Sequence, residues 1–148
     1  MGDSLTYFED VYEFFLSKIK SYDLAELTED EIKEELNSLI KLAFPKCTVF
    51  KGKIKIDLDN ESFVVKGKDS LSLEEMEILS LAMLLQYISP LIARDENLKQ
   101  TLSSKDFSST SQANHLEKLL ILKKSIDADL NYAMNSYTFG NRVYGDWQ

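Results

Sequence analysis

The feature that most limits how this chain can fold is an apolar run from Ile78 to Ile88, which reads Ile-Leu-Ser-Leu-Ala-Met-Leu-Leu-Gln-Tyr-Ile. As a helix this run is apolar around almost its whole circumference, whereas a surface helix keeps only one apolar stripe. A helix of this kind must be covered on all sides. Because the run is too short to span a bilayer, we expect its cover to be the rest of this domain or the same protein in another subunit.

Length and composition indicate one soluble globular domain. A chain of 148 residues with 44% hydrophobic and 28% charged residues is long enough to bury a core without disulfides or metals. The single cysteine, Cys47, excludes an internal disulfide and fits a reducing compartment. The first residues lack a basic stretch followed by an apolar one, so we expect no signal peptide, and we expect no membrane contact.

The net charge of −8 is unevenly distributed. Residues 46–68 hold six lysines against three acidic residues, a local balance of +3, which leaves −11 on the rest of the chain. A binder of duplex DNA normally has a broad basic face. The distribution therefore disfavours sequence-specific DNA binding and suits an acidic surface along which DNA could slide.

Helical spacing of apolar residues predicts four helices. They cover residues 5–21, 28–44, 72–90 and about 111–137, with a further helical piece over 91–102. Capping boxes mark three of the starts. These are Thr6 with Glu9 (Ser4 is a rival cap), Thr28 with Glu31, and Ser72 with Glu75. Pro45 is expected to end the second helix, and Pro90 to end or kink the third.

Between the second and third helices the apolar period changes to two. Lysines alternate with apolar residues after Thr48, and Asp59-Asn60 is a turn signal, so we predict a β-hairpin at about 48–66 with one lysine face. The predicted fold is mainly α, a bundle of about four helices with a small hairpin insertion. Residues 1–137 form this bundle, and 138–148 form an aromatic C-terminal tail without a period.

No cluster of residues specifies a reaction. His115 is the only histidine and is read as a helix residue, and Cys47 as a small buried one. The acids Glu74, Glu75 and Glu77 are explained by the start of a helix. No phosphate-binding glycine loop or hydrolase motif is present. We expect no catalytic residue, no metal and no cofactor, and no enzymatic activity.

Two surfaces have both a structural and a functional interpretation. The lysine face of the hairpin, with Lys51, Lys53 and Lys55, is either a solvated strand face or an electrostatic contact with an acidic partner such as another subunit. The aromatic tail is either frayed or an interface anchor.

Several segments resemble proteins of the tailed-phage virion. Residues 98–107, Leu-Lys-Gln-Thr-Leu-Ser-Ser-Lys-Asp-Phe, followed by Ser111-Gln-Ala-Asn-His-Leu116, are similar to small proteins encoded near the portal and head genes of phages of Gram-positive hosts. The opening Tyr-Phe-Glu-Asp-Val-Tyr-Glu-Phe-Phe, residues 7–15, looks like the same group. The order of helices with a hairpin insertion is like that of head–tail connector (adaptor or neck) proteins.

The resemblance implies a structural protein of the virion neck, present in the host cytoplasm during assembly. Such proteins form a ring beneath the portal, commonly of twelve copies, that extends the DNA channel and joins head to tail. The expected partners are the portal protein, neck or tail-completion proteins and further copies of the chain, with DNA only passing through. Under this hypothesis the last helix and tail dock on the portal, and the lysine hairpin contacts a neighbouring subunit. The portal residues would be Tyr137, Phe139, Arg142, Tyr144 and Trp147.

Two other hypotheses stay open. One is a small helical regulatory protein that binds a single phage or host protein. The other is an accessory subunit of an enzyme.

Overall fold

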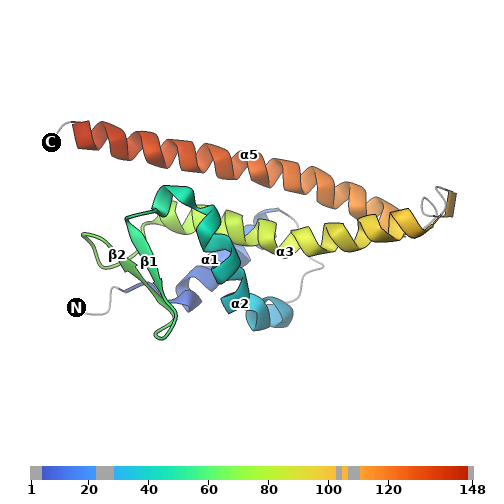
Figure 1. The fold of residues 1–148 in the computed structure, drawn as a ribbon, viewed down its shortest axis with the longest axis horizontal. Helices are drawn as coiled ribbons and strands as arrows, with labels where there is room; N and C mark the ends of the chain where they lie inside the picture. The colour runs from blue at the N-terminus through green and yellow to red at the C-terminus, as the bar shows by residue number, and fades with distance from the viewer. Residues whose placement is uncertain (1–4, 23–28, 103–104, 107–110, 147–148) are drawn as a thin grey trace.

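The computed structural model describes residues 5–22, 29–102, 105–106 and 111–146. It confirms the predicted fold class, because the chain is mainly helical and carries one small antiparallel hairpin (Figure 1). The elements in chain order are the helices α1 (Phe8–Ser21) and α2 (Glu29–Ala43), the 3₁₀ turns η2 (Phe44–Lys46) and η3 (Thr48–Phe50), the strands β1 (Ile54–Asp57) and β2 (Ser62–Val65), and the helices α3 (Leu73–Thr101) and α5 (Ser111–Asp146).

Helix α3 lies at the centre of the molecule. Figure 1 shows α5 running along one side of α3, with α1 and α2 on the other side, and α3 contacts all three. The apolar run is covered by these neighbours. Its buried residues are Ile78, Leu79, Ser80, Leu81, Ala82, Met83, Leu84, Tyr87 and Ile88. A single copy of the chain therefore covers its own apolar helix, and of the two covers considered from the sequence the domain itself is sufficient.

Pro90 does not end α3, which continues to Thr101. Of the two predicted alternatives, a helix end at Pro90 is wrong and a kink is not tested, while the helical piece predicted over 91–102 is present as the continuation of α3. Pro90 itself is exposed. With 29 residues, α3 contains an 18-residue window of mean hydropathy 1.6, long and apolar enough to cross a membrane by composition. However, 56% of that window is buried inside the protein. From the sequence, the short length of the apolar run counted against a membrane span. In the structure, α3 is a core helix because α1, α2 and α5 cover it.

The third predicted cap is confirmed, and the first is wrong. The Glu75 amide donates to Ser72 Oγ at 3.1 Å, and the Ser72 amide donates to Glu75 Oε1 at 2.8 Å. By contrast, α1 begins at Phe8, where Asp10 Oδ2 accepts from the Tyr7 amide at 2.8 Å. Thr6 does not cap, because its hydroxyl accepts from the Leu71 amide at 2.8 Å and ties the start of α1 to the segment before α3.

The two remaining caps lie outside the described residues, since neither Ser4 nor Thr28 is described. The end of α2 is confirmed at Ala43, directly before Phe44-Pro45. Its apolar stripe is buried as predicted, comprising Ile32, Leu36, Leu39, Ile40 and Ala43.

The hairpin is shorter than predicted. Its strands pair Ile54 with Val65 and Asp57 with Ser62, and a 3₁₀ turn occupies Thr48–Phe50 instead of strand. Gly52 has φ +81°, a left-handed conformation that interrupts an extended strand. Lys51 and Lys53 therefore precede β1, and only Lys55 of the three predicted contact lysines lies on a strand.

Helix α5 is longer than predicted, since it runs to Asp146 and not to Tyr137. Residues 138–146, which were predicted to lack regular structure, continue this helix. Its buried face comprises Leu116, Leu119, Ile126, Leu130 and Tyr137. Leu120 and Ile121, although apolar, are exposed.

Candidate interaction surfaces

Cys47 and His115, the two side chains weighed as chemical groups in the sequence, are both in surroundings that give them a structural role. Cys47 is buried, and this burial raises the pKa of its thiol to about 12, so it stays a protonated thiol. His115 Nδ1 lies 2.6 Å from Oδ2 of the buried Asp95, which joins α5 to α3. Arg94 Nε donates to the other oxygen of Asp95 at 3.4 Å. Within the described part of the chain, no group of three or more His, Cys, Asp and Glu side chains is placed to hold a metal ion.

A buried carboxylate fastens the far part of α5. Glu75 Oε2 accepts from the Tyr137 hydroxyl at 2.6 Å, while Oε1 accepts from Lys68 Nζ at 2.7 Å and from the Ser72 amide. Burial alone would raise the pKa of Glu75. The hydrogen bonds from Lys68, Ser72 and Tyr137 together hold it below its usual value, so the carboxylate is ionised.

Tyr137 is therefore a core residue. It is only 6% exposed, its ring meets Phe50 edge-on at 5.9 Å, and Lys53 Nζ lies 5.0 Å from the ring centroid. The sequence placed Tyr137 and Lys53 in two different intermolecular contacts, whereas the structure brings them together within one chain. A side chain buried to this extent offers almost no surface to another protein, so the portal contact predicted for Tyr137 is corrected to a structural role.

The other predicted portal residues fall into two groups. Phe139 is exposed by 69% and is accessible to a partner. Arg142 and Tyr144 lie on the backbone of α5, but their side chains are outside the described residues, as is the whole of Trp147.

The side of α5 that faces away from α3 carries an exposed apolar stripe. Ile121, Tyr132 and Phe139 are exposed by 64%, 75% and 69%. At 3.6 residues per turn, these three lie within about 20° of one another and diametrically opposite the buried face. We define the outer face of α5 as the exposed residues between 121 and 139 whose directions lie within about 40° of that of Ile121. These are Ile121, Ser125, Ala128, Tyr132, Asn135 and Phe139.

The outer face of α5 contains no charged residue, in a chain of which 28% is charged. The nearest exposed charges are Lys124 and Asp129, which flank this face on opposite sides, at about 60° and 80° from the direction of Ile121. The Tyr22 hydroxyl donates to Asp129, and burial together with this carboxylate raises the pKa of Tyr22. Charge depletion with exposed aromatic residues is typical of protein interfaces. Sequence reasoning missed Ile121 and Tyr132 as parts of this face, although the absence of charged residues from 130 to 141 was a usable signal.

The hairpin presents a second surface. Lys55 and Val64 pair across the strands with both side chains outward, and Lys66 donates its amide to the Lys53 carbonyl in the adjacent pair. Lys53, Lys55 and Lys66 thus surround Val64, which is 53% exposed, in a shallow hollow of about 410 Å³. Because Lys66 and not the predicted Lys51 borders this surface, we redefine the lysine face as Lys53, Lys55, Lys66 and Val64.

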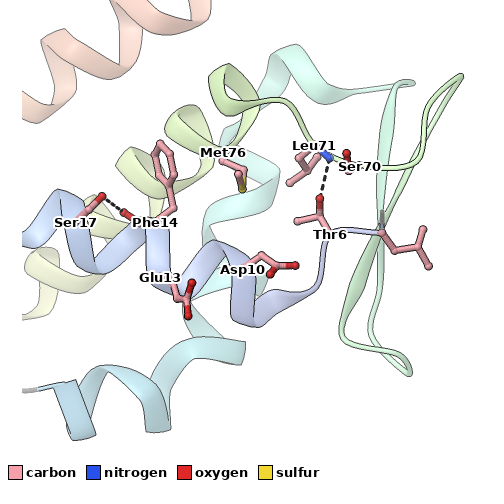
Figure 2. Close-up of a pocket in the computed structure, with 9 residues that line it drawn as sticks. Thr6, Asp10, Glu13, Phe14, Ser17, Ser70, Leu71 and Met76 are labelled. Atoms are coloured by element: carbon pink, nitrogen blue, oxygen red, sulfur yellow. Dashed lines mark hydrogen bonds between the residues drawn. The ribbon is translucent and has the colours of Figure 1, made fainter. Parts of the chain in front are cut away.

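A cleft of about 550 Å³ lies between α1 and the start of α3. Figure 2 shows that Phe14 from α1 and Met76 from α3 contribute apolar side chains, while Asp10 and Glu13 lie along α1. At one end, the hydrogen bond between Thr6 and the Leu71 amide holds the two elements together (Figure 2). Leu5 and Ser70 complete its lining, and we call it the α1–α3 cleft.

Comparisons with protein-family models, with curated proteins and with solved structures found no match to this chain. The surfaces described above are therefore what function can be argued from.

Proposed function

We propose that this chain is a non-catalytic structural protein of the tailed-phage neck, which joins the portal to the tail. The observation that carries the proposal is the outer face of α5, an uncharged stripe with Tyr132 and Phe139 largely exposed. Aromatic residues with depleted charge favour a protein partner over water, whereas a solvated helix face is normally charged. In this proposal the outer face of α5 docks on the portal protein.

The charge distribution supports the same proposal. Outside residues 46–68 the chain carries −11, and phosphate backbones are repelled by such a surface. A ring of these chains around a channel would let DNA pass without holding it. The apolar run of α3 gives no support to a ring, because a single chain buries it.

The proposal is tested by capturing the portal protein of a phage that encodes this chain. The tagged chain is compared with Tyr132→Glu and Phe139→Glu, which place a charge on the outer face of α5. Leu42→Glu is the matched control, because Leu42 is a 57% exposed apolar residue on α2. We expect each α5 variant to weaken portal capture at least tenfold and the Leu42 variant to retain it.

Two outcomes would count against the proposal. One is a wild-type chain that captures no portal protein. The other is equal capture by all three variants, which would separate portal binding from the outer face of α5. Capture of a different single protein through that face would favour the regulatory hypothesis instead.

A further inference from the structure

We propose that neighbouring copies of this chain contact each other by seating the lysine face of one copy in the α1–α3 cleft of the next. This inference rests on the proposed function, which places several copies side by side. It identifies the second surface of that contact, for which sequence reasoning supplied only the lysines.

Charge limits which surfaces two copies can bring together. Each copy carries −8 in total, so two copies repel each other at long range. The local excess of positive charge lies in residues 46–68, with −11 elsewhere. A contact between copies that is favoured by charge must therefore use the hairpin region of one and an acidic surface of the other.

Not every lysine of this region is available for such a contact. Lys68 is paired with the buried Glu75, and Lys53 lies over the ring of Tyr137. Lys55 projects outward beside Val64, and Lys66 borders the same hollow. The lysine face thus combines basic groups with one exposed apolar side chain at its centre.

The α1–α3 cleft has the complementary arrangement. Its acids are Asp10 and Glu13, both exposed and three residues apart, so they share one side of α1. Its apolar contribution comes from Phe14 and Met76, which are half-buried and line the same cleft. Lys18, farther along α1, is already bound by Glu77 and so adds little opposing charge.

The hairpin is a small two-stranded element, and the cleft is a hollow of about 550 Å³ in the helical body. Val64 would meet Phe14 and Met76, while Lys55 and Lys66 would meet Asp10 and Glu13. Because two different surfaces pair, the contact can repeat from copy to copy and close into a ring.

The experiment is a charge exchange read by sedimentation velocity over a concentration series at low salt. The variants are Glu13→Lys, Lys55→Glu and the double variant that carries both. Glu34→Lys, on the exposed side of α2, makes the same change in net charge as Glu13→Lys and is its matched control. Circular dichroism checks that each variant is folded.

We expect each single variant of the contact to raise the dissociation constant between copies at least tenfold. The double variant should recover association to within about threefold of wild type, and the control should match wild type. Added salt should weaken the wild-type contact, because exposed charges are screened within about 10 Å at 0.1 M.

Three results would overturn the inference. These are single variants that behave like Glu34→Lys, a double variant as weak as the singles, and a wild-type chain that stays monomeric both alone and bound to portal. Portal capture by the same variants separates this inference from the proposed function. If capture persists while the charge exchange has no effect, only the contact between copies is wrong. If capture fails while the exchange behaves as expected, only the portal assignment is wrong.

Discussion

Helices α2 and α5 are alike on the side that packs against α3 and differ on the side that faces away from it. Each packs a buried apolar stripe against α3, with Ile40 in α2 and Ile126 in α5 fully inaccessible to solvent. Within about 50° of the direction opposite its buried stripe, α2 carries the charged residues Asp30, Glu34 and Lys41. The outer face of α5 carries none. Because both helices bury an apolar stripe in the core, core packing alone does not explain the difference in charge between their outward sides.

The two helices also differ in how polar groups hold them. Helix α5 has a buried anchor, Tyr137 on Glu75, and a second polar link in His115 on Asp95. For α2 the corresponding side-chain link is Asn37 donating to Glu61 at 3.3 Å, and it is exposed. Buried charge-assisted hydrogen bonds fix geometry more strongly than exposed ones. Helix α5 is thus held in a defined position while presenting an uncharged surface, as a docking element requires.

The largest expected effect tests whether the inner faces are equivalent. Ile40→Ala in α2 and Ile126→Ala in α5 each remove a fully buried side chain and leave a cavity in the core. We expect each to lower the free energy of unfolding by about 2–5 kcal/mol. Urea denaturation followed by circular dichroism measures this. If Ile126→Ala alone lowers the free energy of unfolding by less than about 1 kcal/mol, then α5 packs loosely and the inner faces of α2 and α5 are not equivalent.

The next effect separates the two helices by their polar links. Tyr137→Phe keeps the ring against Phe50 but removes the hydroxyl from the buried Glu75 carboxylate. We expect a loss of about 1–3 kcal/mol, because a buried acceptor loses its partner. Asn37→Ala breaks the exposed link of α2 and should cost less than about 0.5 kcal/mol. Equal costs in the same denaturation measurement would show that the anchor adds nothing.

The same anchor predicts a pH dependence. The pKa of Glu75 is lower in the folded protein than in the unfolded chain, so its ionised carboxylate stabilises the fold. This stabilisation is present at neutral pH and at every pH above the unfolded pKa of about 4.3. It is lost as the pH falls through the folded pKa. Glu75→Gln should therefore be less stable than wild type at pH 7, and the difference should shrink toward pH 3. A constant difference between pH 7 and pH 3 would contradict the assignment.

Short-range patterns in the sequence predicted the features that depend on residues close together in the chain. The box of Ser72 and Glu75 formed as expected, because its partners are three residues apart, and Phe44-Pro45 ended α2 for the same kind of reason. Thr6 carried an equally good signal, yet the Leu71 amide took its hydroxyl. Whether a tertiary partner competes for a cap depends on the folded arrangement, which spacing along the chain does not encode.

The candidate surfaces show the same division. Alternation of lysines predicted the hairpin, but the left-handed Gly52 kept Lys51 and Lys53 out of the strand. Tyr137 was predicted as a docking residue, and only the structure reveals the Glu75 partner that fixes it in the core. The outer face of α5 follows from helical periodicity once the helix is known to pass Tyr137.

The smallest effect on folding is the sharpest test of the comparison. Asn135→Lys on the outer face of α5 and Ser38→Lys on the exposed side of α2 each add one charge at a solvent-exposed helix position. Both should change the free energy of unfolding by less than about 0.5 kcal/mol, because neither position touches the core. Portal capture should nevertheless fall for Asn135→Lys alone. If the added charge leaves the free energy of unfolding unchanged on both helices but weakens portal binding only on α5, then binding of a partner, and not the fold, explains why the outer face of α5 is uncharged.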